Sequence, residues 1–136
     1  QTPHRVIVSK GPLGDQMQLG ERMWGDEFLP QPSILPQCDL LITHGGNNTV
    51  TEGFNFGIPM IVLPLFWDQY DNAQRMDELG FGVRLQTYAF TDEEMVSALM
   101  VASLTIALSF ALVTVSPSEK TCPVVIPIIS NLKVCG

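Results

Sequence analysis

The sequence predicts an α/β protein, in which a parallel sheet is covered by helices. Short apolar runs alternate with helix-like stretches through residues 1–100, and this rhythm is typical of α/β folds. The runs are apolar throughout, as the strands of a sheet buried on both faces are. The 136 residues, 46% of them hydrophobic and 15% charged, are enough for one core but too few for two complete domains.

Four strands are expected in this first part of the chain. Each expected strand is a short apolar run that stops at a loop-forming residue. Pro59 and Pro64 bound the third run, and proline is tolerated at the ends of a strand but not inside a central one. The expected strands are residues 6–8, 40–43, 60–63 and 83–85.

Three helices are expected between and after these strands. Residues 48–56 are about the minimum for a crossover helix, and residues 71–79 place apolar side chains on one stripe. A glycine, the usual helix stop, follows each of these two stretches. A third helix begins at Thr91, because Thr91 and Glu94 have the spacing of a capping box.

The second part of the chain has a different composition. Residues 95–118 contain no charged residue, and about twenty apolar residues can cross a bilayer. Two interpretations stay open: a membrane span over residues 95–115, or a helix that continues from the capping box and buries one face. Residues 101–136 are therefore interpreted as an apolar, helical C-terminal tail, with no element predicted over residues 116–136. In the second interpretation, the buried face of the helix consists of Leu99, Ala102, Ile106 and Phe110.

Charge and metal-ligand spacing exclude two classes of function. Seven Lys and Arg residues stand against fourteen Asp and Glu, for a net charge of -7, whereas nucleic-acid binding depends on basic residues that neutralise phosphates. We therefore expect no nucleic-acid partner. The three cysteines form no CxxC pair, and the two histidines lie at no metal-ligand spacing, so no metal site is expected; these residues are Cys38, Cys122, Cys135, His4 and His44.

The most informative stretch is residues 41–53, which reads as a strand, a glycine-containing turn and a helix start. Gly45 and Gly46 allow the backbone to approach a ligand without a Cβ in the way. The N–H groups of about residues 47–49 would be free at a helix N-terminus, where a phosphate or diphosphate is the natural occupant. The chain contains neither GxxxxGK[ST] nor GxGxxG, which argues against a P-loop nucleotidase and an ordinary dinucleotide fold.

Residues suited to the rest of a nucleotide sugar flank this turn in the sequence. Glu52 lies on the same side of the helix as the turn and can accept from vicinal hydroxyls such as those of a ribose. Asp68 and Gln69 follow the third strand and suit sugar hydroxyls. Phe28 and Gln31 offer an aromatic face beside an amide, which suits a base. Each has a structural alternative: Glu52 as a solvated charge, Asp68 as a helix cap and Phe28 as a core residue.

Taken in order, these spaced motifs resemble the donor-binding signature of the UDP-glycosyltransferases. They are Phe28-x-Pro-Gln31, Ile42-Thr-His44-Gly-Gly-x-Asn48-Thr49-x-x-Glu52, Gly57-Ile-Pro59-Met and Pro64-x-x-x-Asp68-Gln69. That family consists of nucleotide-sugar-dependent enzymes with two facing Rossmann-like domains, the GT-B fold. The resemblance covers about residues 1–100 and implies part of the C-terminal, donor-binding Rossmann-like domain. The spacing from Gln31 to His44 is similar to that of the shorter-spaced bacterial macrolide-type members.

The resemblance implies a contact to each part of a UDP-sugar. Uracil and ribose would be held by Phe28, which stacks on the base, and by Gln31 and Glu52. The diphosphate would be held by His44, Gly46, Asn48 and Thr49, and we expect the anion to favour protonated His44. The donor sugar would be held by Asp68 and Gln69. Phe28 stands where the family usually has Trp, and Thr49 stands where it usually has Ser.

The resemblance also implies an enzyme, a hexosyltransferase that moves a sugar from a UDP-sugar to a small lipophilic acceptor with inversion. The UDP-sugar is a co-substrate, and no other cofactor is expected. In the family, the acceptor pocket and the catalytic base, a His supported by an Asp, lie in the N-terminal domain. Neither His4 nor His44 matches that motif, so no catalytic residue is assigned here. We expect this chain alone to bind UDP weakly and to transfer nothing.

The start of the chain and its apolar stretch leave an alternative of another class. The chain begins at Gln1 without the basic and apolar runs of a signal peptide, so it resembles a piece of a longer cytoplasmic or membrane-associated protein. The alternative is a non-catalytic protein that binds nucleotide or partner subunits. Residues 95–115 would attach such a protein to a membrane.

Overall fold

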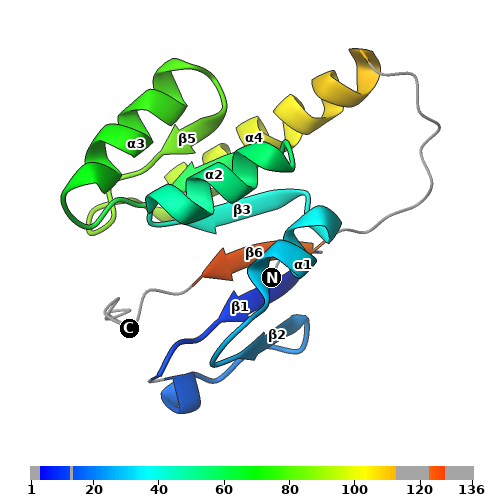
Figure 1. Cartoon of the computed structure of the whole chain (residues 1–136), viewed down its shortest axis with the longest axis vertical. Helices are drawn as coiled ribbons and strands as arrows, with labels where there is room; N and C mark the ends of the chain where they lie inside the picture. The colour runs from blue at the N-terminus through cyan, green and yellow to red at the C-terminus, as the bar shows by residue number, and fades with distance from the viewer. Residues whose placement is uncertain (1–3, 13, 113–122, 128–136) are drawn as a thin grey trace.

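A computed structural model of the chain describes residues 4–12, 14–112 and 123–127. Six parallel strands form one sheet in the order β2-β1-β6-β3-β4-β5. Helices α1, α2 and α3 lie on one face of this sheet, and α4 lies on the other (Figure 1). The α/β architecture with a parallel sheet and flanking helices is therefore confirmed.

The four expected strands are confirmed, and the sheet contains two more. The strands are β1 Arg5–Ser9, β2 Met23–Asp26, β3 Leu40–Thr43, β4 Met60–Val62, β5 Gly82–Arg84 and β6 Pro123–Pro127. The sequence does not predict β2, whose four residues include a glycine and an aspartate. It also does not predict β6, which lies between β1 and β3 and pairs with both, so the interpretation of residues 101–136 as a helical tail is wrong for residues 123–127. The prolines of β6 stand at its two ends, which is where a central strand tolerates them.

The expected helices are confirmed with one shifted start. The helices are α1 Gln31–Ile34, α2 Asn47–Asn55, α3 Asp68–Glu78 and α4 Asp92–Leu112, with short 3-10 turns η1 Gly14–Gln16 and η2 Leu35–Gln37. Gly57 and Gly80 follow α2 and α3 with φ of 65° and 72°, the left-handed conformation that ends a helix. Helix α3 begins three residues before the expected start, and Trp67 occupies its N-cap position. The alternative that Asp68 caps this helix is therefore wrong.

The core consists of two layers, one on each face of the sheet. Successive strand residues point to opposite faces, so Leu41 and Met60 pack with Ala73 and Met76 under α3. On the other face, Ile61 packs with the two buried alanines of α4. Because β3 and β4 are covered on both sides, all of their residues are buried. This double burial is the reason that these strands show no polar alternation in the sequence.

Helix α4 begins at the predicted capping box. The backbone N–H of Glu94 donates to Thr91 Oγ1 at 3.2 Å, and the backbone N–H of Thr91 donates to Glu94 Oε2 at 2.8 Å. Ala98 and Ala102 are buried against the sheet, with Leu99 half-buried beside them. The side chains of residues 106 and 110, which the sequence places on the same face, lie outside the described set. Across the described ranges, no helix combines the length and hydropathy needed to cross a bilayer.

The capping box makes a measurable prediction for stability. We expect Thr91→Ala to lower the free energy of unfolding by about 1 kcal/mol, because the N–H of Glu94 loses its side-chain acceptor. Urea denaturation measures this change. Thr91→Ser keeps the hydroxyl and is the matched control, for which we expect a loss of less than about half that amount. Equal losses for the two variants would contradict the assigned cap.

Candidate functional site

The turn between β3 and α2 is built on two glycines that have no room for a side chain. Gly45 has φ of 87°, and a Cβ on it would lie 2.8 Å from Val62 Cγ1. A Cβ on Gly46 would lie 2.6 Å from His44 Nε2. Strand β4 and the imidazole of His44 therefore close tightly around this backbone, as the sequence led us to expect of the two glycines.

The first turn of α2 presents its backbone N–H groups at this point. The N–H of Val50 donates to Gly46 O at 3.0 Å and is the first N–H to bond within the helix. The three preceding residues, Asn47, Asn48 and Thr49, have N–H groups that cannot bond within the helix. No described side chain caps them. The arrangement is the one that binds phosphate groups at helix N-termini.

Asn72 of α3 holds this turn and was not assigned a role from the sequence. Its Nδ2 donates to Gly45 O at 2.9 Å and to Asn47 Oδ1 at 3.0 Å. One side chain therefore fixes both the glycine turn and the first residue of α2. The only signal in the sequence is its position four residues after Asp68, which places the two on one face of a helix.

Gln31 and Glu52 lie in contact, although they are 21 positions apart. Gln31 Nε2 donates to Glu52 Oε2 at 2.9 Å, which ties α1 to the second turn of α2. Both side chains are half-buried. Glu52 is therefore a partly exposed charge on α2 that is bonded to Gln31, and both interpretations of its role remain open. The alternative of Phe28 as a core residue is wrong, since this ring is 85% exposed.

The segment after β4 carries an exposed aromatic on a strained backbone. Trp67 has φ of 52° and ψ of -131° and is 85% exposed. A non-glycine residue rarely adopts this conformation, and such strain clusters at functional sites. The rings of Phe66 and Trp67 form a T-shaped pair, with the two centroids 5.6 Å apart.

Gln69 stabilises this segment from inside. Gln69 is only 4% exposed, and its Oε1 accepts from the backbone N–H of Leu65 at 2.9 Å and of Phe66 at 3.3 Å. The hydroxyl of Thr87 donates to Pro64 O at 2.5 Å and fixes the start of the same segment. The carbonyl oxygen of Gln69 thus has a structural role, whereas Asp68 beside it is exposed.

The imidazole of His44 and the carboxylate of Asp68 interact electrostatically near the carboxyl ends of β3 and β4. Burial lowers the pKa of His44 below its ordinary value of 6.5, and the negative charge of Asp68 partly opposes that shift. The direction of this shift favours the neutral imidazole. A bound phosphate would act in the same direction as Asp68 and favour the protonated ring.

The structure places the predicted site residues around the carboxyl ends of β3 and β4, where open parallel sheets bind ligands. His44 directly follows β3, and Asp68 lies just after β4. Helix α2 is bonded to α1 through Glu52 and to α3 through Asn47. The remaining predicted residues belong to or flank these elements: Phe28, Gln31, Gly46, Asn48, Thr49 and Gln69.

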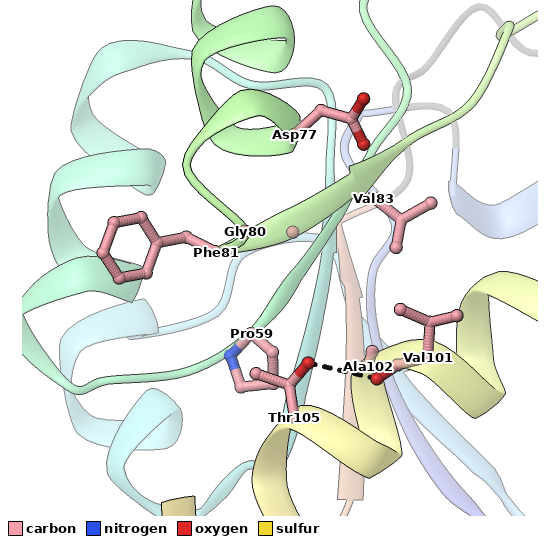
Figure 2. Close-up of a pocket in the computed structure, with 9 residues that line it drawn as sticks. Pro59, Asp77, Gly80, Phe81, Val83, Val101, Ala102 and Thr105 are labelled. Atoms are coloured by element: carbon pink, nitrogen blue, oxygen red, sulfur yellow. Dashed lines mark hydrogen bonds between the residues drawn. The ribbon is translucent and has the colours of Figure 1, made fainter. Parts of the chain in front are cut away.

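A cavity of about 220 Å³ lies at the other end of the strands. Its lining includes Pro59 before β4 and Phe81 before β5, together with Val101 and Thr105 of α4 (Figure 2). Thr105 Oγ1 donates to Val101 O at 3.1 Å, within the helix itself. The cavity is thus at the amino ends of β4 and β5, away from the predicted site. The described part of the chain contains no cluster of metal-ligating side chains.

The comparisons with known proteins agree on one family. Residues 17–103 match the family model "UDP-glucoronosyl and UDP-glucosyl transferase". The chain is 38% identical over 100 residues to human UDP-glucuronosyltransferase 2B28, a match that covers 71% of this chain and 18% of that protein. It is 41% identical over 75 residues to rat UDP-glucuronosyltransferase 1A8, a match that covers 54% of this chain and 14% of that protein. The chain therefore spans less than a fifth of the length of these curated relatives.

Solved glycosyltransferase structures share the fold. The glycotransferase of kitacinnamycin superposes with a TM-score of 0.69 at 28% identity, over 79% of this chain and 29% of that one. The spinosyn rhamnosyltransferase SpnG superposes with a TM-score of 0.65 at 25% identity, over 80% of this chain and 30% of that one. Both likenesses cover most of the present chain, so they concern its fold as a whole.

The strained conformation of Trp67 can be tested by two truncations. Both Trp67→Gly and Trp67→Ala remove the indole, but only alanine keeps a Cβ at a φ of 52°. We expect Trp67→Gly to have the larger free energy of unfolding, by about 1 kcal/mol, in urea denaturation. An alanine variant that is equally stable would show that the backbone here is not strained.

The interaction between His44 and Asp68 can be followed by NMR titration. We expect the His44 ring to titrate below 6.5 in the free protein, because burial disfavours its charged form. Asp68→Asn removes the opposing attraction and should lower the pKa further. The ring signal of His44 is assigned as the one that is missing from the spectrum of His44→Gln. A pKa that rises or stays constant in Asp68→Asn would contradict this electrostatic coupling.

Proposed function

Because the chain belongs to the UDP-glycosyltransferase family, we propose that its described residues bind the UDP-sugar donor at the carboxyl ends of β3 and β4. The UDP-sugar is the co-substrate, and the proposal needs no other cofactor. One observation carries it: the second turn of α2 is bonded to α1 through Glu52 and Gln31, and the glycine turn and first residue of α2 are bonded to α3 through Asn72. These bonds support the proposal because they connect α1, α2 and α3, which carry or adjoin the proposed residues.

The nucleoside is bound by α1, α2 and the loop before α1. Phe28 presents an exposed ring on which uracil stacks. Glu52 accepts from the two ribose hydroxyls with one carboxylate oxygen while Gln31 holds the other. Gln31 also bonds to the base region, which lies between the stacking ring and the ribose.

The diphosphate is bound by the turn and the first turn of α2. The N–H groups there supply positive potential without any basic side chain, which suits a chain whose net charge is -7. Gly46 allows close approach, the side chains of Asn48 and Thr49 donate, and His44 adds a charge when the anion raises its pKa. In the reaction, the same groups stabilise the charge that develops on the departing diphosphate.

The sugar is bound beside Asp68, whose exposed carboxylate accepts from its hydroxyls. Gln69 contributes by holding the segment that presents Asp68 and through its amide group. The proposed reaction is transfer of the hexose, with inversion, to the hydroxyl of a small lipophilic acceptor. The residues of this chain bind and orient the donor in that reaction, and deprotonation of the acceptor is assigned to none of them.

The proposal predicts a specific loss when Glu52 is removed. We expect the 136-residue chain to bind UDP but not NAD in calorimetry, and Glu52→Ala to weaken UDP binding by roughly tenfold or more through lost ribose hydrogen bonds. The loss should be much smaller for 2′-deoxy-UDP, which lacks one of the two hydroxyls.

Glu78→Ala is the matched control for this experiment. Glu78 also accepts from a glutamine side chain, with Gln74 Nε2 at 2.7 Å from its Oε1, but it lies exposed near the end of α3. We expect its removal to leave UDP affinity unchanged. Heat from NAD alone, or equal effects of the two substitutions, would refute the proposed site.

A further inference from the structure

We propose that Trp67 determines specificity for the donor sugar by stacking its indole on the apolar face of a hexopyranose. This inference rests on the proposed function and goes beyond it, since neither the motifs nor the family resemblance assigned Trp67 a role. Four observations carry it: the exposure of the ring, its strained backbone, the bracing of the segment and its position beside Asp68.

The ring is exposed at an energetic cost. A tryptophan side chain gains stability from burial, yet Trp67 is 85% exposed and its backbone has φ of 52°. An extended or helical φ at this position would relieve the strain. Such a conformation persists only where the surrounding structure over-determines it.

The surrounding contacts do over-determine it. Gln69 Oε1 accepts from the two backbone N–H groups that precede Trp67, and the hydroxyl of Thr87 holds Pro64 O from another element. Phe66 lies against the indole at an interplanar angle of 85°, and the indole stays 85% exposed. The backbone that carries this exposed indole is thus held by hydrogen bonds on its N-terminal side.

The position of this indole matches the chemistry of a hexopyranose. A pyranose ring has hydroxyls at its rim and C–H groups on its faces, so it is bound best by acceptors at the rim and an aromatic ring on a face. Asp68 supplies the acceptor next to Trp67, and its charge reaches His44 in the proposed diphosphate site. A sugar joined to that diphosphate and bonded to Asp68 therefore lies within reach of the indole.

Tyr70 and Trp24 are exposed aromatics that do not offer this combination. The ring of Tyr70 is covered by the guanidinium of Arg84, which lies 5.7 Å from its centroid. Trp24 is 57% exposed but belongs to β2, four places from β4 in the sheet order. Trp24 is consequently a suitable control, since it is the same residue type in an exposed position on the same sheet.

The test compares UDP with UDP-glucose on the full 136-residue chain by calorimetry. We expect Trp67→Ala to leave UDP affinity within about twofold of wild type, because UDP lacks the sugar. It should weaken UDP-glucose binding by roughly five- to tenfold, because one apolar face of the sugar is no longer covered. Trp67→Phe should retain part of the preference because it keeps a ring. Trp24→Ala should change neither affinity.

Fluorescence gives an independent readout. The chain has two tryptophans, so Trp24→Phe leaves Trp67 as the single indole emitter. We expect UDP-glucose to shift its emission to the blue and UDP to shift it much less. Normal UDP binding with no effect of Trp67→Ala on UDP-glucose, or equal shifts with both ligands, would overturn the inference alone. Absence of UDP binding by the wild-type chain would overturn the proposed function, and this inference with it.

Discussion

The close approach of backbone at Gly45 and Gly46 is the constraint on which the site depends. A side chain on Gly45 would collide with Val62 of the neighbouring strand, and one on Gly46 would collide with His44. Because neither glycine carries a side chain, β3 can turn directly into α2 at the edge of the sheet. The N–H groups of α2 then face outward at the carboxyl ends of the strands. Asn72 fixes this geometry by bonding to the turn and to the helix at once.

Burial of the central strands on both faces fixes the position at which this turn begins. Strands β3 and β4 are buried on both faces, by α1 to α3 on one side and by α4 on the other. The ends of these strands are therefore held firmly, while the loops after them are free to carry polar and aromatic groups. Strain at Trp67 is tolerated for the same reason, since hydrogen bonds from Gln69 and Thr87 hold its segment against that framework.

The proposed binding of an anionic diphosphate is compatible with an acidic chain. The net charge is -7, but backbone N–H groups supply local positive potential that does not depend on net charge. Burial of the imidazole lowers the pKa of His44, and a phosphate bound there as proposed would act in the opposite direction.

The sequence by itself determined the α/β class, four strands, the glycine turn, the capping box and, through the order of its motifs, the family. These features depend on composition, period and short spacing, which are local properties of a chain. Tertiary structure decided the rest. In the tertiary structure, β6 lies between β1 and β3, and Gln31 is bonded to Glu52. Gln69 is buried, Asn72 is bonded to the glycine turn, and Trp67 is exposed. Each of these outcomes depends on which distant segment occupies the neighbouring space, and a local pattern does not contain that information.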